Sequence, residues 1–203
     1  MKTTKIYLTR HAQSIHNLSD TYNSNPENDK GLSSNGFKQA KQLAKRLEKE
    51  KIDIIYSSNM PRCIQTAVEI AKVIRKKIIV NSKFIEPDMG KYELMKQTQI
   101  ERKYPKIAKM WFGDGAENLT LGESFKTAQK RMLKEVDILA KKHKGKSILI
   151  ITHQAPVKFV VCNLLGGLKY FNVFGIDNAS LTLLEKNNKD YKLKYLNNIS
   201  YLS

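Results

Sequence analysis

Hydrophobic and polar positions along the chain predict strands and helices that follow one another in turn. Short apolar runs predict buried strands at 5–9, 52–56, 77–80 and 147–152. The last run is almost continuously apolar, so we expect it at the centre of a parallel sheet. Apolar residues recur at helical spacing over 36–49, from 61 to 74, and over 123–143 and 155–165. Two apolar segments, 181–185 and 191–196, flank a polar turn and predict a hairpin.

Two stretches interrupt this alternation. Residues 17–35 are rich in Asn, Ser, Asp and Gly and predict a long loop, after which Ser34 or Asn35 would cap the next helix. Residues 83–120 contain several Pro and Gly and only short helical patterns, so they predict an insertion over the sheet. The whole pattern predicts a three-layer α/β/α sandwich with a mainly parallel sheet and a small helical cap. We expect one domain over 1–203, with the cap at about 83–120.

Composition narrows the class of protein. Hydrophobic residues make up 41% and charged residues 27%, as in soluble globular proteins. No apolar run has the length of a membrane span, and the N-terminus lacks the pattern of a secretory signal. Cys63 and Cys162 form no CxxC motif, so neither a disulfide framework nor a structural zinc site is expected. These observations predict a cytoplasmic protein without a membrane partner.

The net charge of +17 has two interpretations. It is typical of a surface that binds nucleic acid. It is also typical of a chain that is rich in lysine throughout, and the lysines here are scattered rather than clustered. We favour the second interpretation, and under either one the mean field attracts anionic substrates.

Polar residues follow three of the predicted strands. Arg10 and His11 follow the first strand, Arg62 follows the second after two serines, and His153 follows the strand at 147–152. In α/β folds ligands bind beyond the carboxyl ends of the strands, so these four side chains should converge there. Such a cluster needs an anion between its members, and phosphate accepts the forked, charge-assisted hydrogen bonds of arginine.

A histidine that faces a phosphate can attack phosphorus when its imidazole is neutral. Arg10 and Arg62 would lower the pKa of His11 and spread the charge of the transferring group. A carboxylic acid must then protonate the leaving oxygen. Glu86, Asp88 and Glu93 follow the third strand and are the candidates.

The chain resembles the histidine phosphatase superfamily of phosphoglycerate mutase-like enzymes. The resemblance spans nearly the whole sequence. Six segments match the family's motifs in order: Arg10-His11-Ala12, Gly31 to Ala40, Tyr56 to Ala67, Glu86 to Glu93, Gly122-Glu123-Ser124 with Arg131, and Ile151-Thr152-His153. Ala12, Leu94 and Gln154 depart from it, because each stands where the family usually has glycine.

The resemblance implies a role for each matching residue. His11 is the nucleophile that forms a phosphohistidine, and Glu86 is the general acid that later activates water. Arg10, Arg62 and His153 hold the phosphoryl oxygens. Asn17 is a further phosphate or substrate contact. Gln154 departs from the family pattern, and we expect it to narrow the pocket as a substrate-binding residue. No metal is implied.

The predicted reaction is hydrolysis of a small phosphorylated metabolite without a cofactor. The alternative is a phosphoglycerate mutase that uses the same residues with 2,3-bisphosphoglycerate as cofactor. The short chain, and Gln13 where mutases usually carry Glu, favour hydrolysis. A non-catalytic module that binds phosphate or nucleic acid is the third reading, and the complete set of catalytic residue types argues against it. A homodimer is left open.

For some residues the sequence favours a structural role, and for others it leaves the role open. His16 and His143 are read as structural. Glu123 and Ser124 either belong to the site or only begin a helix. Trp111 and Phe112 either line the pocket or anchor the cap. Substrate choice is assigned to cap residues, namely Lys91, Lys96, Arg102 and Trp111.

Overall fold

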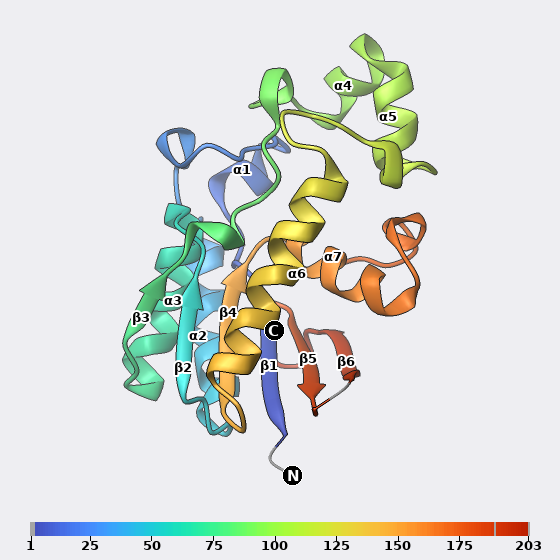
Figure 1. Ribbon diagram of the computed structural model, residues 1–203. Helices are drawn as coiled ribbons and strands as arrows, with labels where there is room; N and C mark the ends of the chain where they lie inside the picture. Colours follow the sequence, from blue (N-terminus) through green and yellow to red (C-terminus); the bar gives the residue numbers. More distant parts are fainter. Residues whose placement is uncertain (1–2, 189, 203) are drawn as a thin grey trace.

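The computed structural model describes residues 3–188 and 190–202, which contain one six-stranded mixed sheet (Figure 1). Its strands are β1 (Thr4–Arg10), β2 (Ile54–Ser57), β3 (Ile78–Val80), β4 (Ser147–Thr152), β5 (Leu181–Lys186) and β6 (Tyr191–Asn198). Their order across the sheet is β3-β2-β4-β1-β5-β6. The pairs β1/β4, β4/β2 and β2/β3 are parallel, and β5 runs antiparallel to both β1 and β6. The mainly parallel sheet, the inner position of β4 and the terminal hairpin are confirmed.

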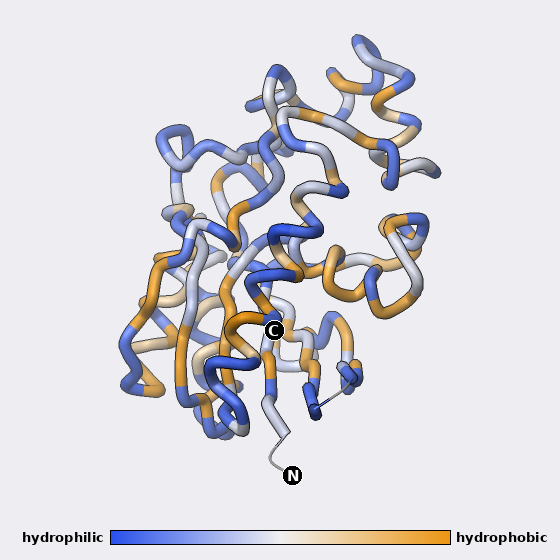
Figure 2. Tube along the Cα trace, in the orientation of Figure 1, coloured by the Kyte–Doolittle hydropathy of each residue, from blue (hydrophilic) through white to orange (hydrophobic). Residues whose placement is uncertain are grey.

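Helices cover both faces of this sheet. Helices α2 (Ser34–Glu48) and α3 (Pro61–Ile74) pack on one face, and α6 (Phe125–Lys142) and α7 (Gln154–Leu165) on the other. Side chains alternate along each strand, because successive residues point to opposite faces. Tyr7 and Leu149 thus contact the α2/α3 layer, whereas the neighbouring Ile6 and Ile150 contact the α6/α7 layer. Figure 2 shows the resulting hydrophobic colouring along the central strands.

The cap stands beyond the carboxyl ends of the parallel strands. It contains α4 (Gln97–Lys103), α5 (Pro105–Phe112) and short 3-10 turns (Figure 1). Its buried residues include Tyr92, Ile100 and Trp111, which form one cluster with Phe125 of α6 and Phe159 of α7. This cluster attaches the cap to one helical layer only. Residues of both helical layers and of the strand ends, among them Arg62 of α3 and Gln154 of α7, border the cavity below. The domain boundaries, with the cap at about 83–120, stay a prediction.

The polar segment before α2 differs from the predicted loop. It begins with a one-turn helix, α1 (Ile15–Leu18), and contains a 3-10 turn, Pro26–Asn28. The predicted cap at Ser34 or Asn35 is wrong, because Ser33 is the N-cap and its Oγ accepts the Gly36 N–H at 2.9 Å. Three serine or asparagine side chains in a row could each cap, and the pattern alone does not choose among them. In the described part of the chain, no helix has the length and apolarity needed to cross a membrane.

Candidate active site

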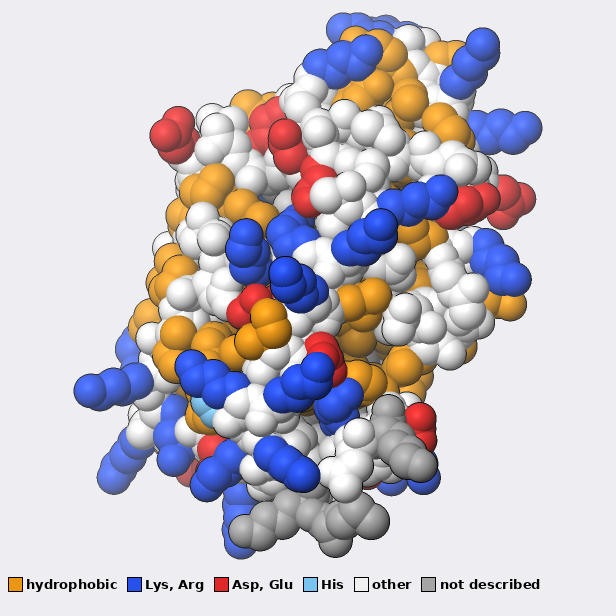
Figure 3. Space-filling view, in the orientation of Figure 1, with side chains coloured by type: hydrophobic (Ala, Val, Ile, Leu, Met, Phe, Trp, Pro, Cys, Tyr) orange, Lys and Arg blue, Asp and Glu red, His pale blue; other side chains and the backbone are white. Residues whose placement is uncertain are grey.

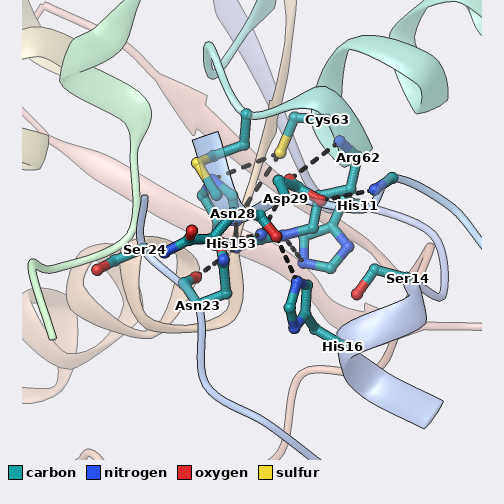
Figure 4. Close-up of polar contacts among 12 residues, drawn as sticks. His11, Ser14, His16, Asn23, Ser24, Asn28, Asp29, Arg62, Cys63 and His153 are labelled. Atoms are coloured by element: carbon teal, nitrogen blue, oxygen red, sulfur yellow. Dashed lines mark hydrogen bonds and ion pairs between the residues drawn. The ribbon is translucent and has the colours of Figure 1, made fainter. Parts of the chain in front are cut away.

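A cavity of about 450 Å³ opens where β1 and β4 end, beneath the cap. The predicted residues Arg10, His11, Arg62, Glu86 and His153 all line it. Figure 4 shows His11, Arg62 and His153 pointing toward one another, although they come from three different elements. The predicted convergence of these side chains is therefore seen in the structure. A cavity of this size suits a small metabolite.

The hydrogen bonds of His11 define its tautomer. Its Nδ1 lies 2.7 Å from the carbonyl oxygen of Ala12, which can only accept, so Nδ1 carries the proton. Nε2 is then the unprotonated nitrogen, and the Arg62 Nε–H donates to it at 3.0 Å. Burial lowers the pKa of His11 well below its ordinary value, and the charges of Arg62 and Arg10 lower it further. His11 is thus a neutral imidazole with its Nε2 lone pair directed into the cationic cluster.

Arg62 is held by groups on three sides. Its Nη1 donates to Asp29 Oδ2 at 3.0 Å and to Asn23 Oδ1 at 3.1 Å, and its Nη2 donates to the Asn23 carbonyl at 2.9 Å. The same Nη2 lies 3.1 Å from His153 Nδ1. The Arg62–Asp29 ion pair is almost completely buried, where losing one partner would leave an uncompensated charge. This network fixes the guanidinium between the two histidines.

His153 and Arg10 complete the cluster. Because Arg62 donates to Nδ1, His153 carries its proton on Nε2, which donates to Ser58 Oγ at 2.9 Å. Burial and the charge of Arg62 lower the pKa of His153 well below its ordinary value. Arg10 donates from Nη1 to the Ile176 carbonyl, and its buried Nε–H has no partner among the described residues. Burial lowers the pKa of Arg10 to about 10, so the guanidinium stays charged at neutral pH.

Of the three candidate acids, Glu86 is the one that lines this cavity. Its Oε1 accepts the Ala155 N–H at 3.3 Å, and its buried Oε2 has no partner among the described residues. Burial raises the pKa of Glu86, against the opposing charges of Arg62 and Arg10. Glu93 instead accepts hydrogen bonds from Ser24, and Asp88 accepts one from a backbone N–H. The geometry therefore favours Glu86 as the acid.

Glu123 and Arg131 support the segment that carries Glu86. Arg131 forms a forked pair with Glu123, with N···O distances of 3.1 and 2.6 Å. Its Nη1 also donates to the carbonyls of Lys83 and Ile85, directly before Glu86. Ser124 is the N-cap of α6. The matching motif thus begins a helix and, through Arg131, holds the acidic segment, while neither Glu123 nor Ser124 lines the cavity.

The structure also places Asn17, Gln154, Ala12 and Leu94, which the sequence had singled out. Asn17 and Gln154 line the cavity. The Asn17 Oδ1 accepts from Ser14 N and Asn178 Nδ2, so part of its role is to hold the loop after His11. Ala12 has no positive φ, and its replacement of glycine adds no backbone strain, whereas Leu94 adopts a left-handed φ of 60°.

The cap and the remaining histidines contribute to the lining of the cavity to different extents. Trp111 and Phe112 line it and also stack on each other in the cap, so both alternatives hold. Lys91, Lys96 and Arg102, assigned to substrate choice with Trp111, are not part of its lining. His16 borders it with both ring nitrogens bonded, to Thr21 and Asn28, and His143 bonds Tyr56 on a distant part of the fold.

Sequence reasoning missed Asn23, Asp29, Asn178 and Lys158. Asn23 and Asp29 hold Arg62 from within the predicted loop. Asn178 donates to the His11 carbonyl at 3.1 Å from the segment before β5. Lys158 lines the cavity from α7. The first three had no signal beyond polar residues in a polar loop. Lys158 had one, because it interrupts the apolar run 155–162 of α7.

Comparison with known proteins agrees with this geometry. Residues 6–199 match the model of the histidine phosphatase superfamily (branch 1). The chain is 34% identical over 182 residues to phosphoserine phosphatase 1 of Hydrogenobacter thermophilus, covering 89% of this chain and 85% of that protein. It is 26% identical over 205 residues to the metal-independent phosphoserine phosphatase of Arabidopsis thaliana, covering 98% and 84%. The solved structure of Entamoeba histolytica phosphoserine phosphatase in complex with 3-phosphoglyceric acid aligns with a TM-score of 0.86 at 26% identity, covering 98% and 100%.

The chain belongs to the histidine phosphatase superfamily. The predicted family and fold class are confirmed, and so is the predicted activity, hydrolysis of a phosphomonoester.

Proposed function

We propose that this enzyme hydrolyses O-phosphoserine, or a closely related small phosphomonoester, through a phosphohistidine on Nε2 of His11. The observation that carries the proposal is the neutral His11, whose unprotonated Nε2 accepts from Arg62 and whose ring lies beside that of His153. The names of the relatives from a bacterium, a plant and an amoeba support phosphoserine as the first substrate to test.

In the first step, Nε2 of His11 attacks phosphorus as the ester P–O bond breaks. Arg10 and Arg62 bind the phosphoryl oxygens, so their charges are in position where negative charge develops. Protonated Glu86 gives its proton to the leaving oxygen, and its raised pKa keeps it protonated to a higher pH than an exposed carboxylic acid. The alcohol leaves, and the phosphoryl group remains on His11.

In the second step, a water molecule attacks phosphorus and the P–N bond breaks. The carboxylate of Glu86 takes a proton from this water, which restores the acid, and inorganic phosphate leaves. His153 stays neutral, and by accepting from Arg62 Nη2 and donating from Nε2 to Ser58 it holds Arg62 beside the phosphoryl group. The cationic charge for both steps comes from Arg10 and Arg62, and we therefore propose that no metal or other cofactor takes part. The name of the plant relative supports this.

The test compares the parent enzyme with His11→Ala, using p-nitrophenyl phosphate and O-phosphoserine in the presence of a chelator. We expect the parent to be active and the variant to lose at least roughly a thousandfold in kcat, as for the removal of a nucleophile. His143→Asn is the matched control, because His143 lies away from the cavity, and it should keep parent activity. Equal activity of the parent and His11→Ala would contradict the mechanism.

The mutase alternative is tested separately. The enzyme is incubated with 3-phosphoglycerate, with and without 2,3-bisphosphoglycerate, and both isomerisation and phosphate release are followed. We expect phosphate release without a requirement for the bisphosphate. Rapid isomerisation with little free phosphate would overturn hydrolysis as the main reaction.

We also propose a cytoplasmic location, supported by Cys63 and Cys162, which are both buried free thiols. A small phosphorylated metabolite is the proposed occupant of the cavity.

A further inference from the structure

A lysine stands in the wall of the active-site cavity with no acid beside it. Lys158 lies one turn after Gln154 on α7, and both residues line the cavity. Only 5% of Lys158 is exposed. Lysine is almost never buried to this degree unless it is paired. No carboxylate of the described residues lies within 4.0 Å of its ammonium group.

The surroundings of Lys158 are aromatic. Its Nζ lies 4.5 Å from the centre of the Phe171 ring and 5.9 Å from that of Phe174. Phe171 also lines the cavity, as do Trp111 and Phe112. Aromatic faces stabilise a cation without neutralising it. An anion that entered this part of the cavity would meet a full positive charge among apolar walls, where charge attraction is stronger than in water.

No protein group of the catalytic cluster is paired with the ammonium group of Lys158. Arg10 and Arg62 already supply two guanidinium groups for the phosphoryl oxygens. Lys158 is near enough to Arg10 and Glu86 for their charges to act on it, but neither forms a hydrogen bond or ion pair with it. Its position in the same cavity therefore suits a second anionic group of the substrate, separate from the phosphoryl group.

We propose that Lys158 binds the carboxylate of the substrate and makes the enzyme selective for small phosphomonoesters of carboxylic acids. This inference rests on the proposed function, because it assigns one end of the substrate to Lys158 and the other to His11. It identifies α7, and not the cap lysines, as the source of this selectivity.

The test uses two substrate pairs that differ in the carboxylate. O-Phosphoserine is compared with O-phosphoethanolamine, which lacks only the carboxylate. 3-Phosphoglycerate is compared with glycerol 3-phosphate, a pair without the amine. We expect the parent to favour the carboxylated member of both pairs in kcat/KM. Lys158→Met keeps most of the length of the side chain and removes the charge. It should lose roughly 10- to 100-fold in kcat/KM for the carboxylated substrates, mainly through KM, and less than about threefold for the others.

Two controls keep the test decisive. Lys158→Arg keeps the charge and should retain most of the preference, which also answers the possibility that Lys158→Met folds poorly. Lys169→Met removes an exposed lysine that stands over the Tyr170 ring, and it should leave both preferences unchanged.

The outcomes separate the two proposals. Phosphate release without any preference for carboxylated substrates, or an equal loss for both members of each pair in Lys158→Met, overturns the role of Lys158 and leaves hydrolysis standing. No phosphate release from any of the four substrates or from p-nitrophenyl phosphate overturns the proposed function itself. A preference that appears with 3-phosphoglycerate alone keeps the role of Lys158 and removes phosphoserine as the substrate.

Discussion

The proposed mechanism depends on two side chains, His11 and Glu86, whose pKa values are shifted in opposite directions. Burial and two neighbouring arginines lower the pKa of His11, so its imidazole stays neutral in mildly acidic solution. Burial raises the pKa of Glu86 above its ordinary value of 4.5, so its carboxyl group stays protonated over part of the same range. A neutral nucleophile beside a protonated acid is the combination that the first step needs.

The pH profile of phosphoserine hydrolysis should report this pairing. Activity needs neutral His11, so kcat/KM falls at low pH only below the ordinary histidine range. Activity also needs protonated Glu86, so it falls as the pH rises through the raised pKa of this residue, and we expect an acidic optimum. In Glu86→Gln the rate should drop about 100-fold or more, and the fall on the alkaline side attributed to Glu86 should disappear. The substrate's own ionisation is common to both enzymes. The same alkaline fall in the variant would exclude Glu86 as the acid.

At the scale of elements, the start of α2 is pressed against the segment that follows the nucleophile. Gly36 lies in the first turn of α2, and a Cβ added there would stand 2.0 Å from the carbonyl oxygen of Gln13. Ser33 caps the helix from the residue before it, and the Ser33 N–H also donates to that carbonyl. The helix and the loop after His11 therefore form one packed unit.

Replacing Gly36 with alanine should disturb this unit. Because the clash is with backbone, relief requires a shift of the loop or of the helix. We expect Gly36→Ala to lower the free energy of unfolding by about 1–3 kcal/mol, which corresponds to roughly 2–4 °C in Tm for each kcal/mol. Phosphatase activity should fall as well. Lys38→Ala, at an exposed position of the same helix, is the control and should be nearly neutral in a thermal melt. A Gly36→Ala enzyme with the parent Tm would show that the Gln13 backbone moves away from the new Cβ without a loss of stability.

The helices and strands were predictable because each buries one face, so its apolar residues recur at a regular spacing. The helix predicted over 123–143 is found at Phe125–Lys142, and the strand predicted over 147–152 is found at those residues. The loop at 17–35 was not predictable in the same way. Asn23 and Asp29 bind Arg62 through a conformation stabilised by tertiary contacts, and polar residues without periodicity carry no sign of such contacts.

The candidate site was predicted from residues at strand ends and in motifs. The prediction therefore included only residues at such positions. His11, Arg62 and His153 each follow a strand of the sheet. Lys158 does not, because it points into the cavity from the second turn of α7, and its effect depends on how that helix lies against the cap. The cap lysines were assigned to substrate choice from sequence position alone, and position in the chain did not reveal which lysine the cavity contains.

At the scale of the whole molecule, positive charge is in large excess, and the lysines are scattered along the sequence. The net charge is +17, and Figure 3 shows Lys and Arg side chains spread over the visible face from one end to the other. A charge distributed in this way raises the local concentration of small anions, and we expect it not to form the continuous patch that a nucleic-acid backbone needs. The concentrated cations of the cavity, Arg10, Arg62 and Lys158, are buried or nearly so and suit a small ligand.

Salt should therefore act on substrate capture and not on the chemical step. Between low ionic strength and about 0.2 M, where the Debye length falls below 10 Å, we expect kcat/KM for O-phosphoserine to fall roughly threefold to tenfold through KM, with kcat unchanged. Salt screens the buried cluster much less, so kcat should not change with salt and serves as the internal control. Double-stranded DNA in excess should not inhibit at 0.15 M salt. If kcat falls in parallel with kcat/KM, salt reaches the catalytic cluster itself. If DNA inhibits with a steep dependence on salt, the distributed charge forms a nucleic-acid surface after all.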